Sequence, residues 1–162
     1  MKIAIIASTG MVGREILRVI SERELKFDSL FLVASKKSVG KSIVFQDSEH
    51  TIIDINTCLN LQPDLIIFSA GSELSLSYAP KFAKIGATVI DNSSAWRMDN
   101  SKKLIIPEIN GHVLNPNDKI IVSTYQSVTG TGKKALTQLE NEYDNVKGEK
   151  AYKYQIHQNA IP

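Results

Sequence analysis

Cysteine is almost missing from this chain of 162 residues, in which Cys58 stands alone. A single cysteine cannot form an internal disulfide, which excludes a disulfide scaffold and fits a reducing compartment. Long apolar runs are also missing: none approaches the roughly 18 residues that a membrane-spanning helix needs. The first run, residues 3–7, is shorter than the roughly 7–15 residues of a signal-peptide core. We therefore expect a soluble cytoplasmic protein with no membrane partner.

An excess of charge of one sign is lacking as well. Lys and Arg number 19 against 17 Asp and Glu, a net charge of +2, and the lysines are spread along the chain. Binding to nucleic acid needs a basic cluster, so we expect no nucleic-acid partner. The three histidines, His50, His112 and His157, lack metal-ligand spacing, so we expect no metal site.

Short apolar runs alternate with helical periods, which predicts an α/β fold with a doubly wound parallel sheet of the Rossmann type. Strands are expected over residues 2–7, 29–34, 43–45, 51–55, 64–69, 88–90, 104–106 and 119–125. Helices are expected over residues 10–23, 72–84 and 133–143. In the first helix, the pattern predicts a buried face of Val12, Ile16, Val19 and Ile20.

The first strand runs into a turn with Gly10 and Gly13, and then into a helix. Glycines let a pyrophosphate approach the backbone, and a helix N-terminus offers free N–H groups. The turn therefore predicts a dinucleotide-phosphate site, although Ala7 occupies the place of the motif's first glycine. The alternative is an ordinary turn in which Gly10 is a hinge.

The residues after the second strand bear on the choice between NAD and NADP. NAD sites place an Asp or Glu there for the ribose hydroxyls. This chain has Ser35-Lys36-Lys37-Ser38 and no carboxylate. Two hydroxyls and two ammonium groups suit a 2′-phosphate, so NADP is the preferred cofactor. The alternative is a solvated lysine-rich loop.

Two later strand ends carry small or polar residues. Residues 69–72 are small enough to admit a ribose or a nicotinamide. Residues 91–97 are polar and end at Arg97, whose guanidinium suits a carboxylate or a phosphate. The alternative for both is turn and capping chemistry. Residues 127–134 fail the P-loop pattern, because its first glycine is absent and Lys134 replaces the magnesium-binding hydroxyl. Cys58 is interpreted as structural.

Taken together and in this order, several stretches resemble the aspartate-β-semialdehyde dehydrogenases, especially the bacterial form. They are residues 7–15, 34–38, 68–71, 91–98, 107–110 and 123–132. A neighbouring family, the N-acetyl-glutamyl-phosphate reductases, is less similar over residues 92–98. The resemblance implies an NADP-binding Rossmann-like domain over residues 1–121. It implies that residues 122–162 are the start of an incomplete α+β catalytic and dimerisation domain.

The resemblance also implies an activity and a set of site residues. The reaction is the NADPH-dependent reductive dephosphorylation of aspartyl-β-phosphate to aspartate-β-semialdehyde, on the way to lysine, threonine and methionine, in a homodimer. The cofactor diphosphate would be held by Thr9, Gly10, Met11 and Val12. The 2′-phosphate would meet Ser35, Lys37 and Ser38, and the nicotinamide side would be lined by Ser69, Ala70 and Gly71. The substrate phosphate would be bound by Asn92, Ser93 and Arg97.

The chain departs from the family at the nucleophile. In the family, an Asn-Pro-Asn-Cys stretch follows a strand like residues 119–121, but here Ile121 joins Val122 directly. Residues 115–117 are Asn-Pro-Asn but precede that strand. The family's catalytic histidine lies beyond the equivalent of Pro162. We therefore expect no catalytic residue, weak packing after Asp118, and NADP binding without turnover. The alternative is a non-catalytic nucleotide-binding or subunit-interaction module.

Overall fold

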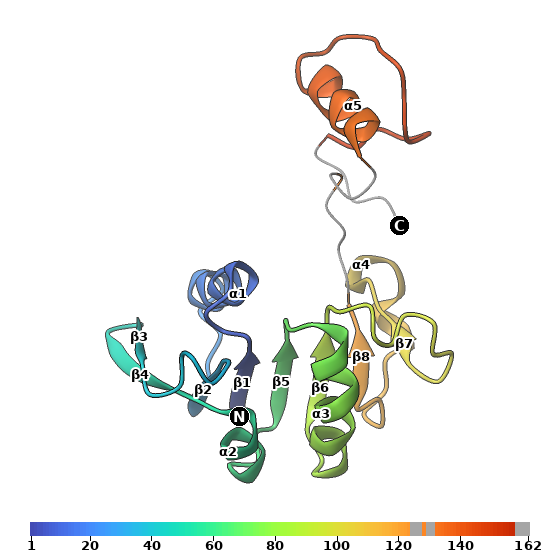
Figure 1. Ribbon diagram of the computed structural model, residues 1–162. Coiled ribbons are helices and arrows are strands. Elements are labelled where there is room, and N and C mark those ends of the chain that lie inside the picture. Colours follow the sequence, from blue (N-terminus) through green and yellow to red (C-terminus); the bar gives the residue numbers. More distant parts are fainter. Residues whose placement is uncertain (124–127, 129–131, 158–162) are drawn as a thin grey trace. The chain divides into compact units, whose positions relative to one another are not determined.

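A mostly parallel sheet organises residues 1–124, the first of two units into which the chain divides; residues 125–162 form the second. The computed structural model describes residues 1–123, 128 and 132–157. Within them the strands are β1 (Lys2–Ile6), β2 (Ser29–Val33), β3 (Ser42–Phe45), β4 (Ser48–Ile53), β5 (Leu65–Phe68), β6 (Thr88–Asp91), β7 (Lys103–Leu104) and β8 (Ile120–Val122). Figure 1 shows the arrows of this sheet and the helices beside it.

The strand order across the sheet is β3-β4-β2-β1-β5-β6-β8-β7. Six of these strands, β4-β2-β1-β5-β6-β8, are parallel and follow the order that dinucleotide-binding domains adopt, with the first strand at the centre. β3 pairs antiparallel with β4 at one edge, and β7 pairs parallel with β8 at the other. The expected doubly wound parallel sheet is confirmed.

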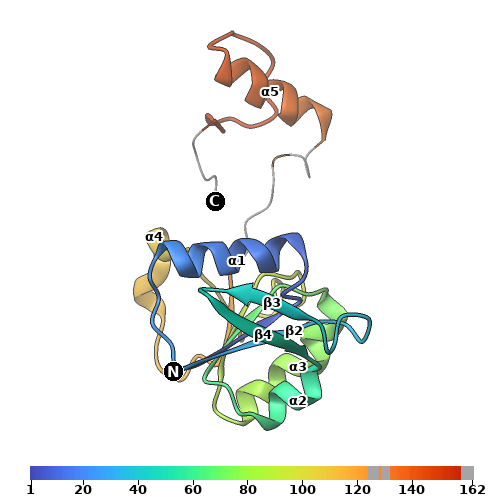
Figure 2. The same ribbon diagram turned by 90° about the vertical axis from the view of Figure 1, so that its left-hand side faces the viewer.

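Helices cover both faces of the sheet (Figure 2). They are α1 (Met11–Glu22) on one face and α2 (Ile55–Asn60) and α3 (Ser72–Lys84) on the other, while α4 (Pro107–Asn110) and a 3-10 turn (Gly111–Val113) follow β7. Alternate residues of β1 serve the two faces: Ile3 and Ile5 pack with the α1 side, and Ala4 and Ile6 with the α2 and α3 side. All four are fully or almost fully buried, because a central parallel strand is covered twice.

The predicted buried face of α1 is wrong in two positions. The helix buries Gly13, Leu17 and Ile20, whereas Val12 and Val19 are 48% and 42% exposed. The reason is Gly13, which has no side chain and therefore lets the backbone of α1 lie close to the turn after β1. This contact orients the helix so that residues 13, 17 and 20 face the sheet.

The sequence did not predict α2, which occupies residues assigned to a strand end and a loop. β4 ends at Ile53, and Asp54 then begins the helix. One carboxylate oxygen of Asp54 accepts hydrogen bonds from the backbone N–H groups of Asn56 (2.9 Å) and Thr57 (3.1 Å). This is N-capping by an aspartate, which satisfies donors that a helix start leaves unpaired.

Packing continues past Asp118, where we expected it to weaken. Ile120 and Val122 are buried in β8, between β6 and β7. β8 therefore runs through the join of Ile121 and Val122, where the resemblance places a missing segment. No helix in the described ranges is long and apolar enough to cross a membrane.

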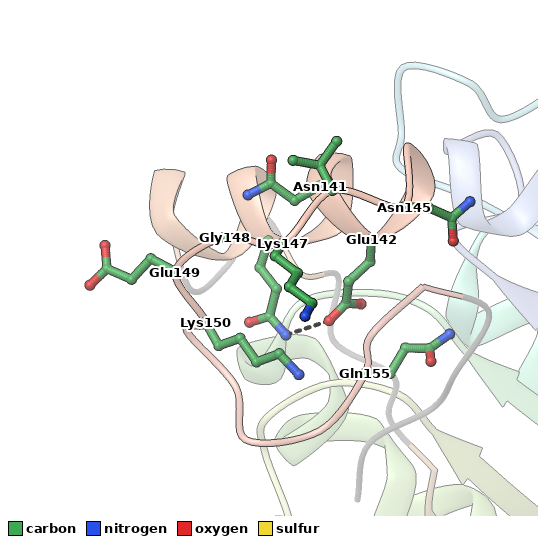
Figure 3. A pocket seen from close by; sticks show the side chains of 10 residues that line it. Asn141, Glu142, Asn145, Lys147, Gly148, Glu149, Lys150 and Gln155 are labelled. Atoms are coloured by element: carbon green, nitrogen blue, oxygen red, sulfur yellow. Dashed lines mark hydrogen bonds between the residues drawn. The ribbon is translucent and has the colours of Figure 1, made fainter.

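The second unit contains α5 (Lys133–Tyr143), with the bounds that the sequence predicts, and the segment that follows it. Gln138 is 1% exposed and holds that segment. Its side-chain amide oxygen accepts hydrogen bonds from the backbone N–H groups of Ala151 (2.7 Å) and Tyr152 (2.8 Å). Its amide nitrogen donates to the Glu142 carboxylate at 2.7 Å, drawn dashed in Figure 3. The polar pocket drawn there is thus built by contacts within the second unit.

Candidate functional site

Four strand ends lie in one row across the sheet. Ile6 of β1 pairs with Val33 of β2 and with Phe68 of β5, and Phe68 pairs with Asp91 of β6. The residues that follow these strands therefore leave the sheet at one edge. In open α/β sheets, this carboxyl edge is where ligands bind, next to the point where the strand order reverses. Here the reversal lies between β1 and β5.

The turn after β1 brings the backbone of α1 very close to the strand. Ala7 has a φ of 65°, in the left-handed region that glycine adopts without strain. A Cβ added to Gly13 would lie 2.5 Å from the Ala7 carbonyl oxygen. Ser8 is fully buried and donates its hydroxyl to the Val33 carbonyl at 3.2 Å, which ties the turn to β2.

The N-terminus of α1 is open to a ligand. Gly10 is the N-cap residue and offers no side-chain hydrogen bond, and the first turn holds no acidic residue. Met11 is 89% exposed and Val12 is exposed beside it. The first N–H groups of a helix have no partner within the helix and carry its positive dipole end. The predicted residues Thr9–Val12 thus lie together at a place that suits a diphosphate.

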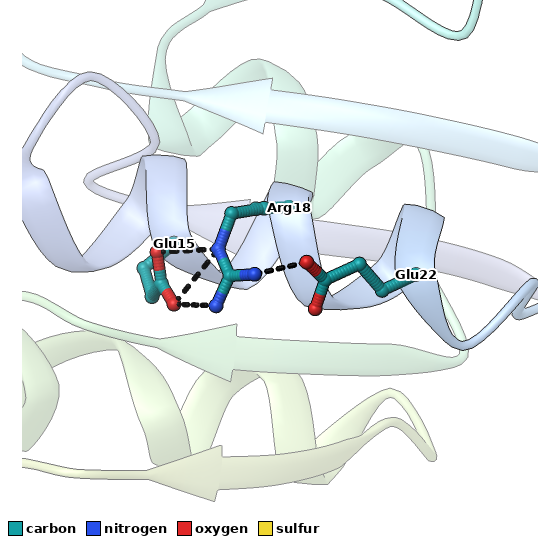
Figure 4. A network of polar contacts seen from close by, with 3 residues as sticks. All are labelled: Glu15, Arg18 and Glu22. Carbon is teal, nitrogen blue, oxygen red and sulfur yellow. Dashed lines mark hydrogen bonds and ion pairs between the residues drawn. The ribbon is translucent and has the colours of Figure 1, made fainter.

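The nearest acidic residue of α1 is paired with a cation. Glu15 and Glu22 flank Arg18 on the exposed side of the helix, and both form ion pairs with it (Figure 4). The hydrogen bond from Arg18 lowers the pKa of Glu15. The charge of Glu15 is therefore compensated one turn away from the N-terminus.

The segment after β2 carries the predicted 2′-phosphate residues on a turn. The Ser38 N–H donates to the Ser35 carbonyl at 2.8 Å, and Lys36 and Lys37 are exposed. Neither lysine forms an ion pair with a described residue, and no carboxylate stands at residues 34–41. The turn thus leaves two ammonium groups available to an anionic ligand.

The ends of β1 and β5 are tied together by Ser69. Its hydroxyl donates to the Ile6 carbonyl at 2.7 Å, and its N–H donates to the same oxygen at 3.3 Å. Ala70 and Gly71 follow, and Gly71 is the N-cap residue of α3. A Cβ on Gly71 would meet nothing within 4 Å. The predicted nicotinamide side is therefore a segment of small residues with open space beside it.

The segment after β6 is organised by a buried carboxylate. Asp91 is fully buried and accepts hydrogen bonds from the Ser93 N–H and from the hydroxyl of Ser75 on α3. Asn92 donates its N–H to the Phe68 carbonyl at 3.2 Å, and Arg97 is exposed at the far end of the segment. Asn92, Ser93 and Arg97 thus lie on one short segment at the carboxyl edge.

Sequence reasoning missed Ser75. It lies inside a helix, where a serine carries no signal in the sequence, and it is fully buried. Its hydroxyl joins Asp91 to the indole N–H of Trp96, which donates to it at 2.8 Å. The only hint in the sequence is the position: Ser75 stands on the inner face of α3 with Ala79 and Phe82.

Cys58 lies on α2, which follows the end of β4, and is fully buried. Burial, with a smaller effect of Asp54, raises the pKa of its thiol to about 12. A thiolate is the nucleophilic form, so Cys58 is unsuited to nucleophilic catalysis near neutral pH. The described residues contain no group of three His, Cys, Asp or Glu side chains that could hold a metal ion. Of residues 127–134, which fail the P-loop pattern, only 128 and 132–134 lie within the described ranges.

The fold and this edge define a dinucleotide-binding α/β domain. The family described as semialdehyde dehydrogenase, NAD binding domain, matches residues 2–116. The chain therefore belongs to the semialdehyde dehydrogenase family and contains its NAD-binding domain. This confirms the expected family and a nicotinamide nucleotide as cofactor.

Individual relatives and solved structures agree with this family assignment. An aspartate-semialdehyde dehydrogenase of Aquifex aeolicus is 38% identical over 99% of this chain, and one of Bacillus subtilis is 34% identical over 99%. The crystal structure of aspartate semialdehyde dehydrogenase II of Vibrio cholerae, complexed with ASA, is 36% identical, with a TM-score of 0.72 over 88% of this chain and 46% of that one. The chain spans 58% of the length of the Aquifex and Bacillus relatives.

The match to the Aquifex relative contains positions that this chain lacks. It extends over 197 residues, although this chain has 162 residues in all. At least 35 matched positions therefore have no counterpart in this chain. That number of missing positions is in keeping with the internal deletion that we expect at Ile121 and Val122.

Proposed function

We propose that this chain is the cofactor-binding part of an NADP-dependent aspartate-semialdehyde dehydrogenase. The observation that carries the proposal is the row of strand ends Val33, Ile6, Phe68 and Asp91, which gathers the predicted cofactor and substrate residues at one edge. The aspartate-semialdehyde dehydrogenases of Aquifex aeolicus and Bacillus subtilis align with 99% of the chain. The reaction is the reductive dephosphorylation of aspartyl-β-phosphate to aspartate-β-semialdehyde, for lysine, threonine and methionine biosynthesis.

The residues at the edge fit the parts of NADP in order. Thr9–Val12, at the open N-terminus of α1, would hold the diphosphate. Ser35, Lys37 and Ser38 would hold the 2′-phosphate, because the exposed turn carries hydroxyls and ammonium groups and no carboxylate. Ser69, Ala70 and Gly71 would line the nicotinamide side. When bound, the nicotinamide supplies or accepts the hydride.

The substrate phosphate would lie on the neighbouring segment. Asn92 and Ser93 would donate hydrogen bonds, and the exposed guanidinium of Arg97 would bind the phosphate oxygens. The family reaction needs a thiolate that forms a thioacyl intermediate, and the high pKa of Cys58 makes it unsuited to that step. We therefore propose ligand binding without turnover for these residues.

A second function is favoured by the positions of the Aquifex relative that this chain lacks. A domain that binds the cofactor but lacks the nucleophile would act as a binding or subunit-interaction module, associated with a complete subunit in a dimer. We propose a cytoplasmic location, with which either function and the single cysteine are in keeping. Co-purification with a complete relative would favour this function over an independent one.

The first experiment is a thermal melt of the full chain with NADP⁺ and, separately, with NAD⁺. A ligand that binds only the folded state at 100 times its Kd stabilises that state by about 2.7 kcal/mol. We expect NADP⁺ to raise the Tm clearly and NAD⁺ to raise it less. Equal shifts with both nucleotides would contradict the 2′-phosphate assignment, and no shift with either would contradict the cofactor site.

A charge reversal tests the same assignment at one residue. Lys37→Glu should remove the preference for NADP⁺ while leaving the Tm of the unliganded protein nearly unchanged, because Lys37 is exposed. Lys26→Glu is the matched control, because Lys26 is also exposed but precedes β2, at the opposite end of that strand. The control should keep the full NADP⁺ shift. An unaltered preference in Lys37→Glu would assign the 2′-phosphate to other residues.

A further inference from the structure

Three polar groups form a chain of hydrogen bonds between α3 and the segment that carries Arg97. The Ser75 hydroxyl donates to the Asp91 carboxylate, and the Trp96 indole N–H donates to the Ser75 oxygen at 2.8 Å. The second carboxylate oxygen of Asp91 accepts from the Ser93 N–H. Asp91 and Ser75 are fully buried, so water cannot replace these bonds without local opening.

A second contact joins the same two segments at the surface. The hydroxyl oxygens of Ser72 and Ser94 are 2.8 Å apart. The segment from Asp91 to Trp96 is thus hydrogen-bonded to Ser72 and Ser75, near the start of α3. The contacts lie at the first residue of the segment, in its middle and at its last residue. Arg97 directly follows Trp96, so the position of its backbone depends on where the indole is held.

We propose that Ser75 is a positioning residue for the substrate-phosphate site: its hydroxyl, between Asp91 and Trp96, holds the segment in the conformation that presents Arg97 to the phosphate. This inference rests on the proposed function, because that function assigns the phosphate to Arg97. Removing the hydroxyl would leave the indole N–H and a carboxylate oxygen without partners, and a buried polar group is costly when unpaired. The segment would relax to pair these groups elsewhere and would move Arg97 with it.

The test uses Ser75→Ala in the full chain, with Ser77→Ala as the matched control. Ser77 lies on the same helix but is exposed and donates only to the Glu73 carbonyl of its own helix. Binding of inorganic phosphate and of NADP⁺ is measured by calorimetry. We expect Ser75→Ala to weaken phosphate binding by about tenfold, equal to 1.4 kcal/mol, and to change NADP⁺ binding by less than about twofold. Ser77→Ala should leave both unchanged.

Fluorescence gives a readout that a loss of stability alone would not move. Trp96 is the only tryptophan, so the emission of the folded protein reports on its indole. We expect the emission maximum to shift in folded Ser75→Ala, which loses the partner of the indole N–H, and to stay unchanged in Ser77→Ala. If Ser75→Ala does not melt cooperatively, Asp91→Asn replaces it, with the same expected loss of phosphate affinity.

The outcomes separate the inference from the function on which it rests. Equal phosphate affinity and equal emission in wild type and Ser75→Ala would overturn the inference and leave the function standing. NADP⁺ binding without phosphate binding in the wild type would overturn the inference and the assignment of Arg97, but not the cofactor site. A wild type that binds neither ligand would overturn the proposed function as well.

Discussion

Gly13 and Ala7 form the closest approach between α1 and the strand before it. A Cβ at residue 13 would lie 2.5 Å from the Ala7 carbonyl oxygen and 2.6 Å from the Ser8 Cα. These neighbours are backbone atoms, which cannot rotate away as a side chain can. The start of α1, and with it the proposed diphosphate site, therefore depends on the absence of one methyl group.

Gly13→Ala should destabilise the fold. Overpacking costs typically about 1–3 kcal/mol, and a clash with backbone falls at the upper end of that range. The free energy of unfolding, measured by urea denaturation, gives the change. Gly10→Ala is the control, since a Cβ there would lie 3.4 Å from the same Ala7 oxygen, an ordinary contact. Equal stability of Gly13→Ala and wild type would mean that α1 shifts freely along β1.

Ala7→Gly should stabilise the protein. Ala7 has a φ of 65°, and this left-handed conformation costs a residue with a Cβ about 1–2 kcal/mol. Part of that gain is lost because glycine is more flexible in the unfolded chain, so we expect a net gain of about 1 kcal/mol. Ala4→Gly, in the middle of β1, should do the opposite. A loss of stability in Ala7→Gly would show that its methyl group packs more favourably than the strain costs.

Cys58 should resist thiol reagents in the folded state. Burial raises the pKa of its thiol from 9.0 to about 12, and the reactive thiolate is correspondingly rare. We expect no labelling by a disulfide reagent at pH 8 without denaturant and complete labelling in urea. Rapid labelling of the folded protein would show that α2 opens locally.

The same thiol makes stability depend on pH in the alkaline range. Because the folded pKa lies above the unfolded value, the folded state keeps its proton longer. The free energy of unfolding should therefore decrease as pH rises from about 9 towards 12. Cys58→Ala should remove this part of the decrease. An identical pH dependence in the two proteins would contradict the assignment to Cys58.

Asp54→Ala should destabilise α2 and thereby weaken the packing of Cys58, which lies on this helix. The hydrogen bond from the Thr57 hydroxyl, followed by the backbone N–H bonds, lowers the pKa of Asp54. The stabilisation is therefore present above the unfolded pKa and is lost as pH falls through the lower folded value. We expect a lower Tm for Asp54→Ala at pH 7 and a smaller difference below pH 3. Asp144→Ala, at an exposed position with a φ of −84°, serves as the control and should leave the Tm nearly unchanged at both pH values.

Much of the fold could be predicted because its pattern is local. The bounds of α3 and α5 follow from helical period and end signals, and the buried strands follow from short apolar runs. α2 was missed because it spans only Ile55–Asn60 and lacks room for a period to appear. The face of α1 was misjudged because the close approach of Gly13 to Ala7 outweighs the hydrophobic pattern.

The site could be predicted only as a set of segments. Strand ends are visible in the sequence, and the parallel sheet brings them to one edge. The bond between Ser75 and Asp91 joins residues 16 positions apart on different elements, and no sequence period connects them. Such contacts arise from how α3 packs on the sheet, which is a property of the whole domain.

The two edge strands of the sheet determine how readily strands of other chains can add to it. β7 has two residues, Lys103 and Leu104, and Pro107 follows shortly after it; β3 at the other edge has four. An exposed edge strand recruits further strands only where it offers a row of free backbone groups, and short or proline-flanked edges offer few. Because β8 is covered by β7, the strand that contains the join does not itself form the open border. We therefore expect that few further strands can add to the sheet at this border.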